Sequence, residues 1–118
     1  MKDFSTSTNC PVRNVLDRLS DKWTTLVVLV LGEHEKMRFN ELHKAIGDIS
    51  EKMLTVSLRK LEADGLIARQ VFPVIPPKVE YQLTDLGRNF LPLIDSISNW
   101  AYQNMEEIMN NRQQYQAS

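Results

Sequence analysis

The succession of residue patterns between Met37 and Leu83 constrains the fold more than any other part of this chain. Residues 40–65 have the caps, apolar spacing and central Gly47 of two short helices joined by a tight turn. Residues 66–83 read as two strands around a proline-containing tip. Helix, turn, helix and hairpin in this order predict a winged helix-turn-helix, which places one helix in a DNA major groove and the hairpin beside it.

The second helix of this block, expected over about residues 50–64, has one apolar and one polar face. Its apolar stripe consists of Leu54, Leu58 and Leu61. At ~100° per residue, the opposite side holds Lys52, Thr55, Val56 and Arg59. The basic groups can contact phosphates or guanine edges, and the methyl groups can contact thymine. This face therefore predicts a DNA-reading helix, with a merely solvated helix face as the alternative.

Polar residues before the two helices are candidate caps and phosphate contacts. Ser50 is expected to cap the second helix, and its hydroxyl could bind a phosphate oxygen together with the nearby amides. Asn40 is expected to cap the first helix, over residues 41–46, and a base contact is its less favoured role. Arg38 is a candidate phosphate contact, with an ion pair to a neighbouring carboxylate as the alternative.

The hairpin is expected to form a wing over about residues 66–83. In its second strand, the apolar residues expected to be buried are Val79, Tyr81 and Leu83. The tip is stiffened by three prolines, Pro73, Pro76 and Pro77. Lys78, beside this tip, is a candidate contact to the DNA backbone or minor groove. Residues 37–39 are expected to form a further short strand.

Three more helices are expected outside this block, over residues 11–19, 22–31 and about 85–109. The helix over residues 22–31 is apolar nearly all round, which is typical of a central buried helix. Pro92 is expected to kink the last helix. The first and last helices offer more apolar surface than one compact monomer needs, so we expect a homodimer that pairs through these N- and C-terminal helices.

The expected domain organisation is simple. Residues 10–110 are expected to form a single domain of α+β class, mostly helical. Residues 1–9 are expected to be disordered, although Asn9 could cap the first helix. Residues 111–118 have little to bury and are expected to be a frayed tail.

The charge distribution favours the block as a DNA-binding face only modestly. The whole chain carries a net charge of −1. Residues 36–80 hold eight basic and six acidic side chains, a net of +2, whereas the remainder holds six basic and nine acidic ones, a net of −3. DNA binding requires local positive potential rather than a basic whole protein.

Several classes of protein are disfavoured by composition. The longest apolar stretch, residues 26–31, is too short to cross a membrane, and the polar N-terminus lacks the apolar region of a signal peptide. One cysteine excludes an internal disulfide framework, so we expect a cytoplasmic protein without a membrane partner. Cys10, His34 and His43 do not assemble a catalytic or metal-binding set, so we expect neither an enzyme nor a cofactor.

Several sequence motifs together resemble the HxlR-type transcriptional regulators. They are CPV at 10–12, DKWTTLVVLVL at 21–31, RFNEL at 38–42, ISEKMLT at 49–55, LRKLEADGLIARQVF at 58–72 and PPKVEYQLTDLGR at 76–88, with the late Trp100. The resemblance implies a dimeric bacterial DNA-binding regulator related to the MarR group, acting on a pseudo-palindromic operator. It also implies that residues 50–64 form the recognition helix and that dimers pair through the N- and C-terminal helices.

The resemblance raises the question of what controls such a regulator. Some family members sense electrophiles or oxidants through a cysteine at the position of Cys10, and a helix N-terminus favours the reactive thiolate. Without a second cysteine, the available chemistry is alkylation, a mixed disulfide or a Cys10–Cys10′ bridge. A small packed residue at a dimer seam is the alternative. Trp23 and Trp100 could line a small-molecule pocket, although core or interface anchors are the commoner role.

One rival function remains open from the sequence. A winged helix that has lost DNA binding would serve as a protein-interaction module, dimerising or docking a partner. The outward face of the helix over residues 50–64 would then be a solvated surface.

Overall fold

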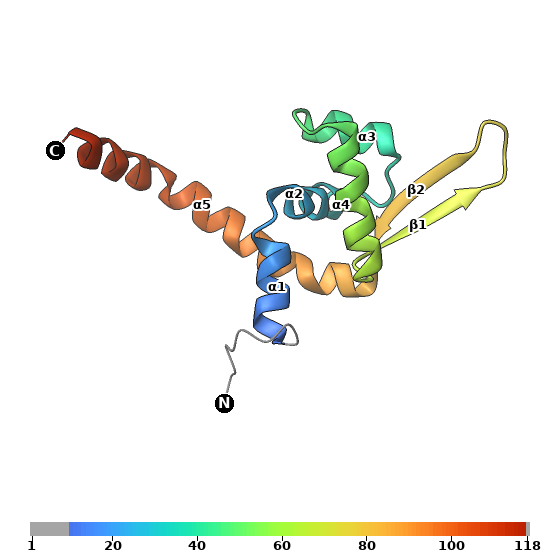
Figure 1. Cartoon of the computed structure of the whole chain (residues 1–118), viewed down its shortest axis with the longest axis horizontal. Helices are drawn as coiled ribbons and strands as arrows, with labels where there is room; N and C mark the ends of the chain where they lie inside the picture. The colour runs from blue at the N-terminus through green and yellow to red at the C-terminus, as the bar shows by residue number, and fades with distance from the viewer. Residues whose placement is uncertain (1–9, 118) are drawn as a thin grey trace.

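The computed structural model describes residues 10–117. In this part of the chain the elements are α1 (Pro11–Leu19), α2 (Lys22–Gly32), α3 (Phe39–Ile46), α4 (Glu51–Ala63), β1 (Ile67–Phe72), β2 (Lys78–Leu83) and α5 (Asp85–Ala117). Figure 1 shows α2, α3 and α4 gathered in the body of the molecule, with the β1–β2 hairpin projecting from one side and α5 from the other. This is the winged helix-turn-helix expected from the sequence.

Helix α2 is the centre of the core. It contacts α1, α3, α4, α5 and β2. Val27, Val28 and Leu31 are at most 1% exposed, as expected for a helix that is apolar nearly all round. The Asp21 carboxylate begins the helix by accepting hydrogen bonds from the amides of Trp23 and Thr24.

The first helix of the helix-turn-helix begins earlier than expected. Arg38 occupies the N-cap of α3, and Asn40 lies inside the first turn, so the assignment of Asn40 as the cap is wrong. Here the Glu41 carboxylate accepts a hydrogen bond from the Arg38 amide at 2.8 Å, which pairs the backbone N–H of the N-cap and favours a helix that starts at Phe39. Gly47, with φ of 92°, then makes the turn towards α4.

The hairpin is a two-stranded antiparallel sheet in which Ile67 pairs with Leu83 and Phe72 with Lys78. The further strand expected over residues 37–39 is reduced to a single bridge, in which Met37 and Tyr81 exchange two backbone hydrogen bonds of 2.9 and 2.8 Å. The expected one-sided burial of β2 is also wrong. Only Leu83 is buried. Tyr81 packs at the edge of the core beside Met37, and the strand before it projects from the body, so both faces are covered to an intermediate degree.

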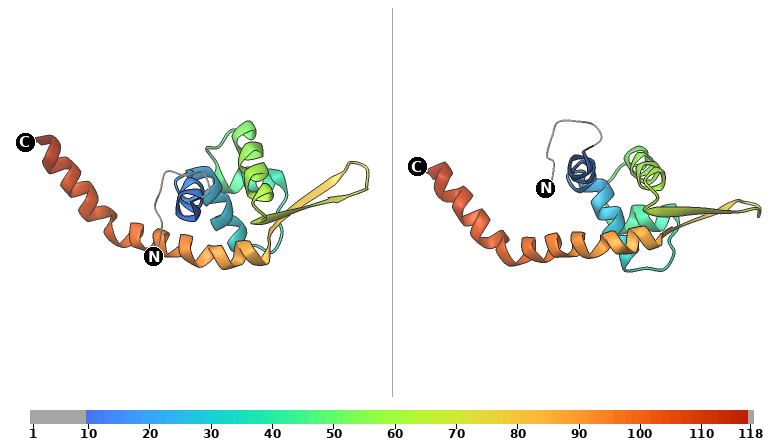
Figure 2. Two further views of the ribbon diagram at one scale, coloured as in Figure 1. Left: turned by 60° about the horizontal axis from the view of Figure 1, so that its bottom comes forward. Right: turned by 90° about the horizontal axis from the view of Figure 1, so that it is seen from below.

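Helix α5 is longer than expected. It runs from Asp85 through Pro92 to Ala117 without interruption, so the segment expected to be a frayed tail from residue 111 is helical over its described part. Figure 2 shows that this helix bends along its length and leaves the body. The radius of gyration is 17.2 Å, compared with ~13–14 Å for a compact chain of this length. Much of α5 therefore lacks a packing partner within the protomer.

Helices α5 and α1 differ in how their N-termini are capped. Thr84 caps α5, since its hydroxyl oxygen accepts a hydrogen bond from the Gly87 amide at 3.1 Å. Cys10 occupies the N-cap of α1 but makes no side-chain capping bond. The expected cap at Asn9, and the disorder expected for residues 1–9, lie outside the described residues.

The glycines at positions 87 and 32 differ in what an added side chain would contact. A Cβ atom at Gly87 would lie 2.1 Å from the Leu66 carbonyl oxygen, whereas one at Gly32 would meet only the flexible Leu91 side chain. Gly87→Ala is therefore expected to lower the free energy of unfolding by about 1–3 kcal/mol. The matched Gly32→Ala variant should cost less, because Leu91 can change rotamer. Urea denaturation measures both, and equal effects would contradict the close contact.

Candidate nucleic-acid interface

The leucines of α4 pack into the core and leave the opposite face of the helix outward. Leu54, Leu58 and Leu61 are 0–2% exposed. On the opposite side, Lys52 and Arg59 are exposed, while Thr55 and Val56 are half-buried. The structure therefore brings these four predicted site residues together on one helix face. Its two cations are long, exposed side chains on a helix whose other side is buried, which suits contact to a polyanion.

The hydroxyl groups on α4 have local hydrogen-bond partners. Ser50 caps the helix as expected, accepting a hydrogen bond from the Met53 amide at 3.1 Å. Thr55 donates to the Glu51 carbonyl oxygen at 2.9 Å. The Ser50 hydroxyl hydrogen remains able to donate, and the helix N-terminus adds partial positive charge beside it. Both residues are thus compatible with the phosphate and methyl contacts expected of them.

Arg38 and Asn40 lie apart from this face, at the start of α3. Both are exposed and line a shallow hollow together with Lys36, Glu41 and Glu80. The two carboxylates reduce the positive potential there. The ion pair considered between Arg38 and Glu41 is not formed, because Glu41 bonds to the Arg38 backbone amide instead.

Lys78 lies at the base of the hairpin tip and is held along β2. Its ammonium nitrogen is 3.7 Å from a Glu80 carboxylate oxygen and 5.1 Å from the centre of the Phe72 ring. The tip beyond it is apolar, with Val74 52% and Ile75 fully exposed. An exposed apolar tip was not anticipated from the sequence, where Pro73, Pro76 and Pro77 dominate the pattern.

Cys10 is buried, with 3% of its surface exposed. Its carbonyl oxygen accepts hydrogen bonds from the backbone amide of Asn14 at 3.1 Å and from the Asn14 side-chain amide at 2.9 Å. The Cys10 sulfur is therefore poorly accessible to a reagent in this conformation.

An open cavity of about 450 Å³ lies between α1, the end of α4 and α5. Its apolar lining comes from Val15, Leu66, Leu86, Phe90 and Leu93. Neither Trp23 nor Trp100 lines it, so it is not the tryptophan-lined pocket considered as the less common role of these residues. Lys22 instead lies over the Trp23 ring, and Trp100 is 59% exposed on α5.

Four charged residues that sequence reasoning did not pair with one another connect α4 to the α1–α2 corner. The Arg18 guanidinium donates two hydrogen bonds to the Asp64 carboxylate, with the Nη2–Oδ1 pair 3.2 Å apart. This contact raises the pKa of Arg18. The Lys60 ammonium lies 3.4 Å from Asp21 Oδ2. These partners are 46 and 39 positions apart, so no local pattern could have paired them.

Residues 18–109 match the HxlR-like helix-turn-helix model. The chain belongs to the HxlR-like family. Among this family's members, the HTH-type transcriptional regulator YtfH of Escherichia coli is 40% identical over 100 residues, which cover 85% of this chain and 79% of that protein. The regulator BH0655 of Halalkalibacterium halodurans is 39% identical over 94 residues, covering 80% and 83% respectively.

Solved structures of HxlR-like regulators share the fold. The transcriptional regulator ytfH from Salmonella typhimurium aligns with a TM-score of 0.83 at 34% identity, covering 96% of this chain and 99% of that one. The redox regulator HypR in its reduced form aligns with a TM-score of 0.79 at 37% identity, covering 85% and 98%. This chain is thus an HxlR-like transcriptional regulator with a DNA-binding fold, and its relatives are regulators rather than enzymes.

Within residues 10–117, no group of three or more histidine, cysteine or acidic side chains could hold a metal ion. His43 has a structural contact instead, with its Nε2 2.8 Å from the Ile49 carbonyl oxygen and its ring stacked on Phe39. No described helix is both long and apolar enough to span a bilayer.

The Ser50 cap generates a prediction that separates folding from DNA contact. Ser50→Ala should lower the free energy of unfolding by about 1 kcal/mol, because the Met53 amide loses its acceptor. Ser50→Asp keeps a capping oxygen and should leave stability nearly unchanged, but its charge should weaken DNA binding. Urea denaturation and fluorescence anisotropy with duplex DNA measure the two effects. Unaltered DNA affinity in Ser50→Asp would remove this helix end from the interface.

Proposed function

We propose that this regulator binds a pseudo-palindromic operator as a homodimer, with one α4 in each of two successive major grooves ~34–36 Å apart. The observation that carries this proposal is the outward face of α4. Lys52 and Arg59 are exposed there, and neither forms an ion pair with another residue in the described range 10–117. Their helix cannot turn them away without exposing the buried leucine stripe.

Homodimerisation is supported by large apolar side chains that are about half exposed in the protomer. On α1, Leu16 is 53% exposed, and on α5 the exposed fractions of Leu93, Ile97 and Trp100 are 51–59%. An apolar face of this kind on a protruding helix favours burial against a second copy, and a twofold axis would give two reading helices.

The remaining site residues take supporting roles in this proposal. Arg38 and Lys78 would contact phosphates on either side of the groove, and Asn40 would lie near the backbone. Such contacts set orientation and affinity rather than sequence preference. The regulator would act in the cytoplasm, where bacterial DNA is found.

Control by an effector is the second part of the proposal. The related protein HypR is a redox regulator with both oxidised and reduced structures. Its likeness supports thiol chemistry at Cys10 of this chain. Because the Cys10 side chain is buried at the N-cap of α1, an element of the proposed dimer face, the proposed modification would require a conformational change that exposes its sulfur.

The role of Arg59 can be tested by truncation. If Arg59 reads a base, Arg59→Ala should weaken operator binding by about 1–3 kcal/mol and relax the preference at that position. If it contacts phosphate alone, affinity for all sequences should fall together with a shallower salt dependence. Arg112→Ala, which removes the same charge from distant α5, is the control. Equal operator affinity in both variants would exclude Arg59, and absence of DNA binding by the unaltered protein would favour the protein-interaction module.

The dimer face can be tested with a pair of exposed apolar residues. Leu93→Glu on α5 should convert the dimer to monomers, because a carboxylate would be buried at the seam. Ile75→Glu at the hairpin tip introduces the same change at a fully exposed site and should leave the dimer intact. Sedimentation equilibrium gives both masses, and a dimeric Leu93→Glu variant would place the seam elsewhere.

A further inference from the structure

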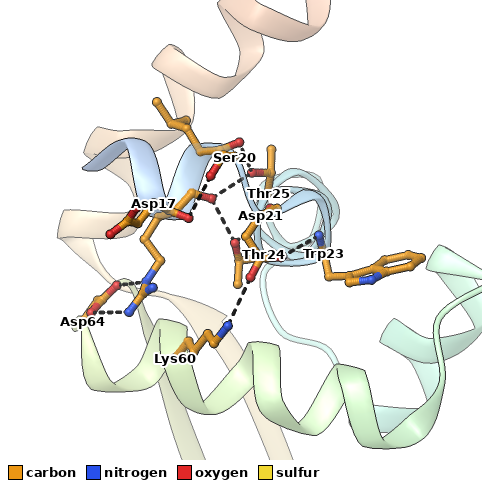
Figure 3. Close-up of polar contacts among 10 residues, drawn as sticks. Asp17, Ser20, Asp21, Trp23, Thr24, Thr25, Lys60 and Asp64 are labelled. Carbon is orange, nitrogen blue, oxygen red and sulfur yellow. Dashed lines mark hydrogen bonds and ion pairs between the residues drawn. The ribbon is translucent and has the colours of Figure 1, made fainter. Parts of the chain in front are cut away.

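Two ion pairs join the C-terminal half of α4 to the corner between α1 and α2 (Figure 3). Arg18 of α1 forms a two-bond contact with Asp64, the residue that ends α4. One turn earlier, Lys60 of α4 reaches Asp21, the residue that begins α2. Bidentate pairing of guanidinium with carboxylate fixes orientation as well as distance.

The corner that receives these contacts is itself well ordered by hydrogen bonds. Asp21 uses one oxygen to cap α2 and the other to meet Lys60, so the ion pair is fixed to the helix start. The buried Thr24 hydroxyl lies 3.1 Å from the Arg18 carbonyl oxygen, and Thr25 lies 3.3 Å from the same oxygen. Figure 3 shows these threonines beside Asp21 at the corner.

The ion pairs engage a flank of α4 that is not part of its buried leucine stripe. Lys60 and Asp64 are four residues apart and so share one flank of the helix. This flank is roughly 100° round from the leucine stripe and separate from the outward face. The side chains in these pairs are 21–44% exposed, and exposed ion pairs contribute little to stability. Their geometric effect is to link the C-terminal half of α4 to the α1–α2 corner at a fixed distance and direction.

The same corner belongs to the proposed dimer face. Val15 and Leu16, in the same helix as Arg18, are 44% and 53% exposed. The angle between α1 and α4 would therefore determine the separation and rotation of the two reading helices in a dimer. One base pair of spacing corresponds to ~3.4 Å and ~35°, so a small change in this angle would alter which operator spacing fits.

We propose that Arg18 and Lys60, through Asp64 and Asp21, are positioning residues that set the half-site spacing the regulator accepts. The inference rests on the proposed function, since it requires a dimer with α4 in the groove. It assigns a role in specificity to side chains that need not contact DNA.

The experiment uses the full chain and a site selected by the unaltered protein from a random duplex pool. Operator variants then carry one base pair inserted or removed between the half-sites. Affinity is measured for Arg18→Met, Lys60→Met and their combination, which retain apolar side-chain length. Arg88→Met removes the same charge from an α5 position outside the two ion pairs. Lys60→Arg restores a cation that can meet Asp21.

The unaltered protein and Arg88→Met should lose at least about tenfold in affinity when the spacing changes, on the scale of a mismatched base pair. The double variant should lose less than about threefold, with its half-site sequence preference and salt dependence preserved. Lys60→Arg should show the same loss of affinity on altered spacing as the unaltered protein. Circular dichroism and urea midpoints establish that each variant is folded, and Lys60→Met alone carries the test if Arg18 variants do not fold.

The possible results distinguish a failure of the positioning role from a failure of the proposed function. If the unaltered protein selects no site, the proposed function fails and the inference fails with it. If it selects a spaced site and the variants keep the same spacing penalty, only the positioning role is overturned. A reduced salt dependence in Lys60→Met would show that Lys60 contacts phosphate directly, which also overturns the positioning role.

Discussion

The packing of the α4 leucine stripe onto α2 is the interaction on which the remaining structure depends. Leu54, Leu58 and Leu61 are almost fully buried, and burial of such a side chain contributes about 1.5–3 kcal/mol. Because α2 is apolar nearly all round, the other elements surround it, and α4 has one orientation in which its leucines are covered. The outward position of Lys52 and Arg59 follows from what is buried behind them, rather than from any attraction of their own.

Features set by residues close in sequence could be predicted. Ser50 as a cap, Gly65 after α4 and the leucine stripe each depend on signals within one or two helical turns. The start of α3 depends on more. Asn40 is a good capping residue, but Glu41 already satisfies the Arg38 amide, and Met37 is fixed from a distance by its bridge to Tyr81. A local preference was overridden by a tertiary contact.

Features that depend on distant partners or on long-range geometry were missed. The α4 ion pairs connect residues 46 and 39 positions apart, and each charge alone looks like an ordinary surface side chain. The reach of β2 beyond the body explains why the alternation of Val79 and Tyr81 does not produce one buried face. The helical continuation past residue 109 lacked the apolar spacing used to set that boundary, yet propagation of an existing helix needs no new nucleus.

The exposed apolar face of α5 makes the behaviour of the regulator depend on its concentration in the cell. If a second copy supplies the missing cover, the folded state gains stability by mass action as the protein concentration rises. A separated protomer would lose that support and also the second DNA contact that multiplies affinity. Operator occupancy would then rise more steeply than the amount of regulator, so that a modest change in expression or degradation would act as a threshold on the genes it controls.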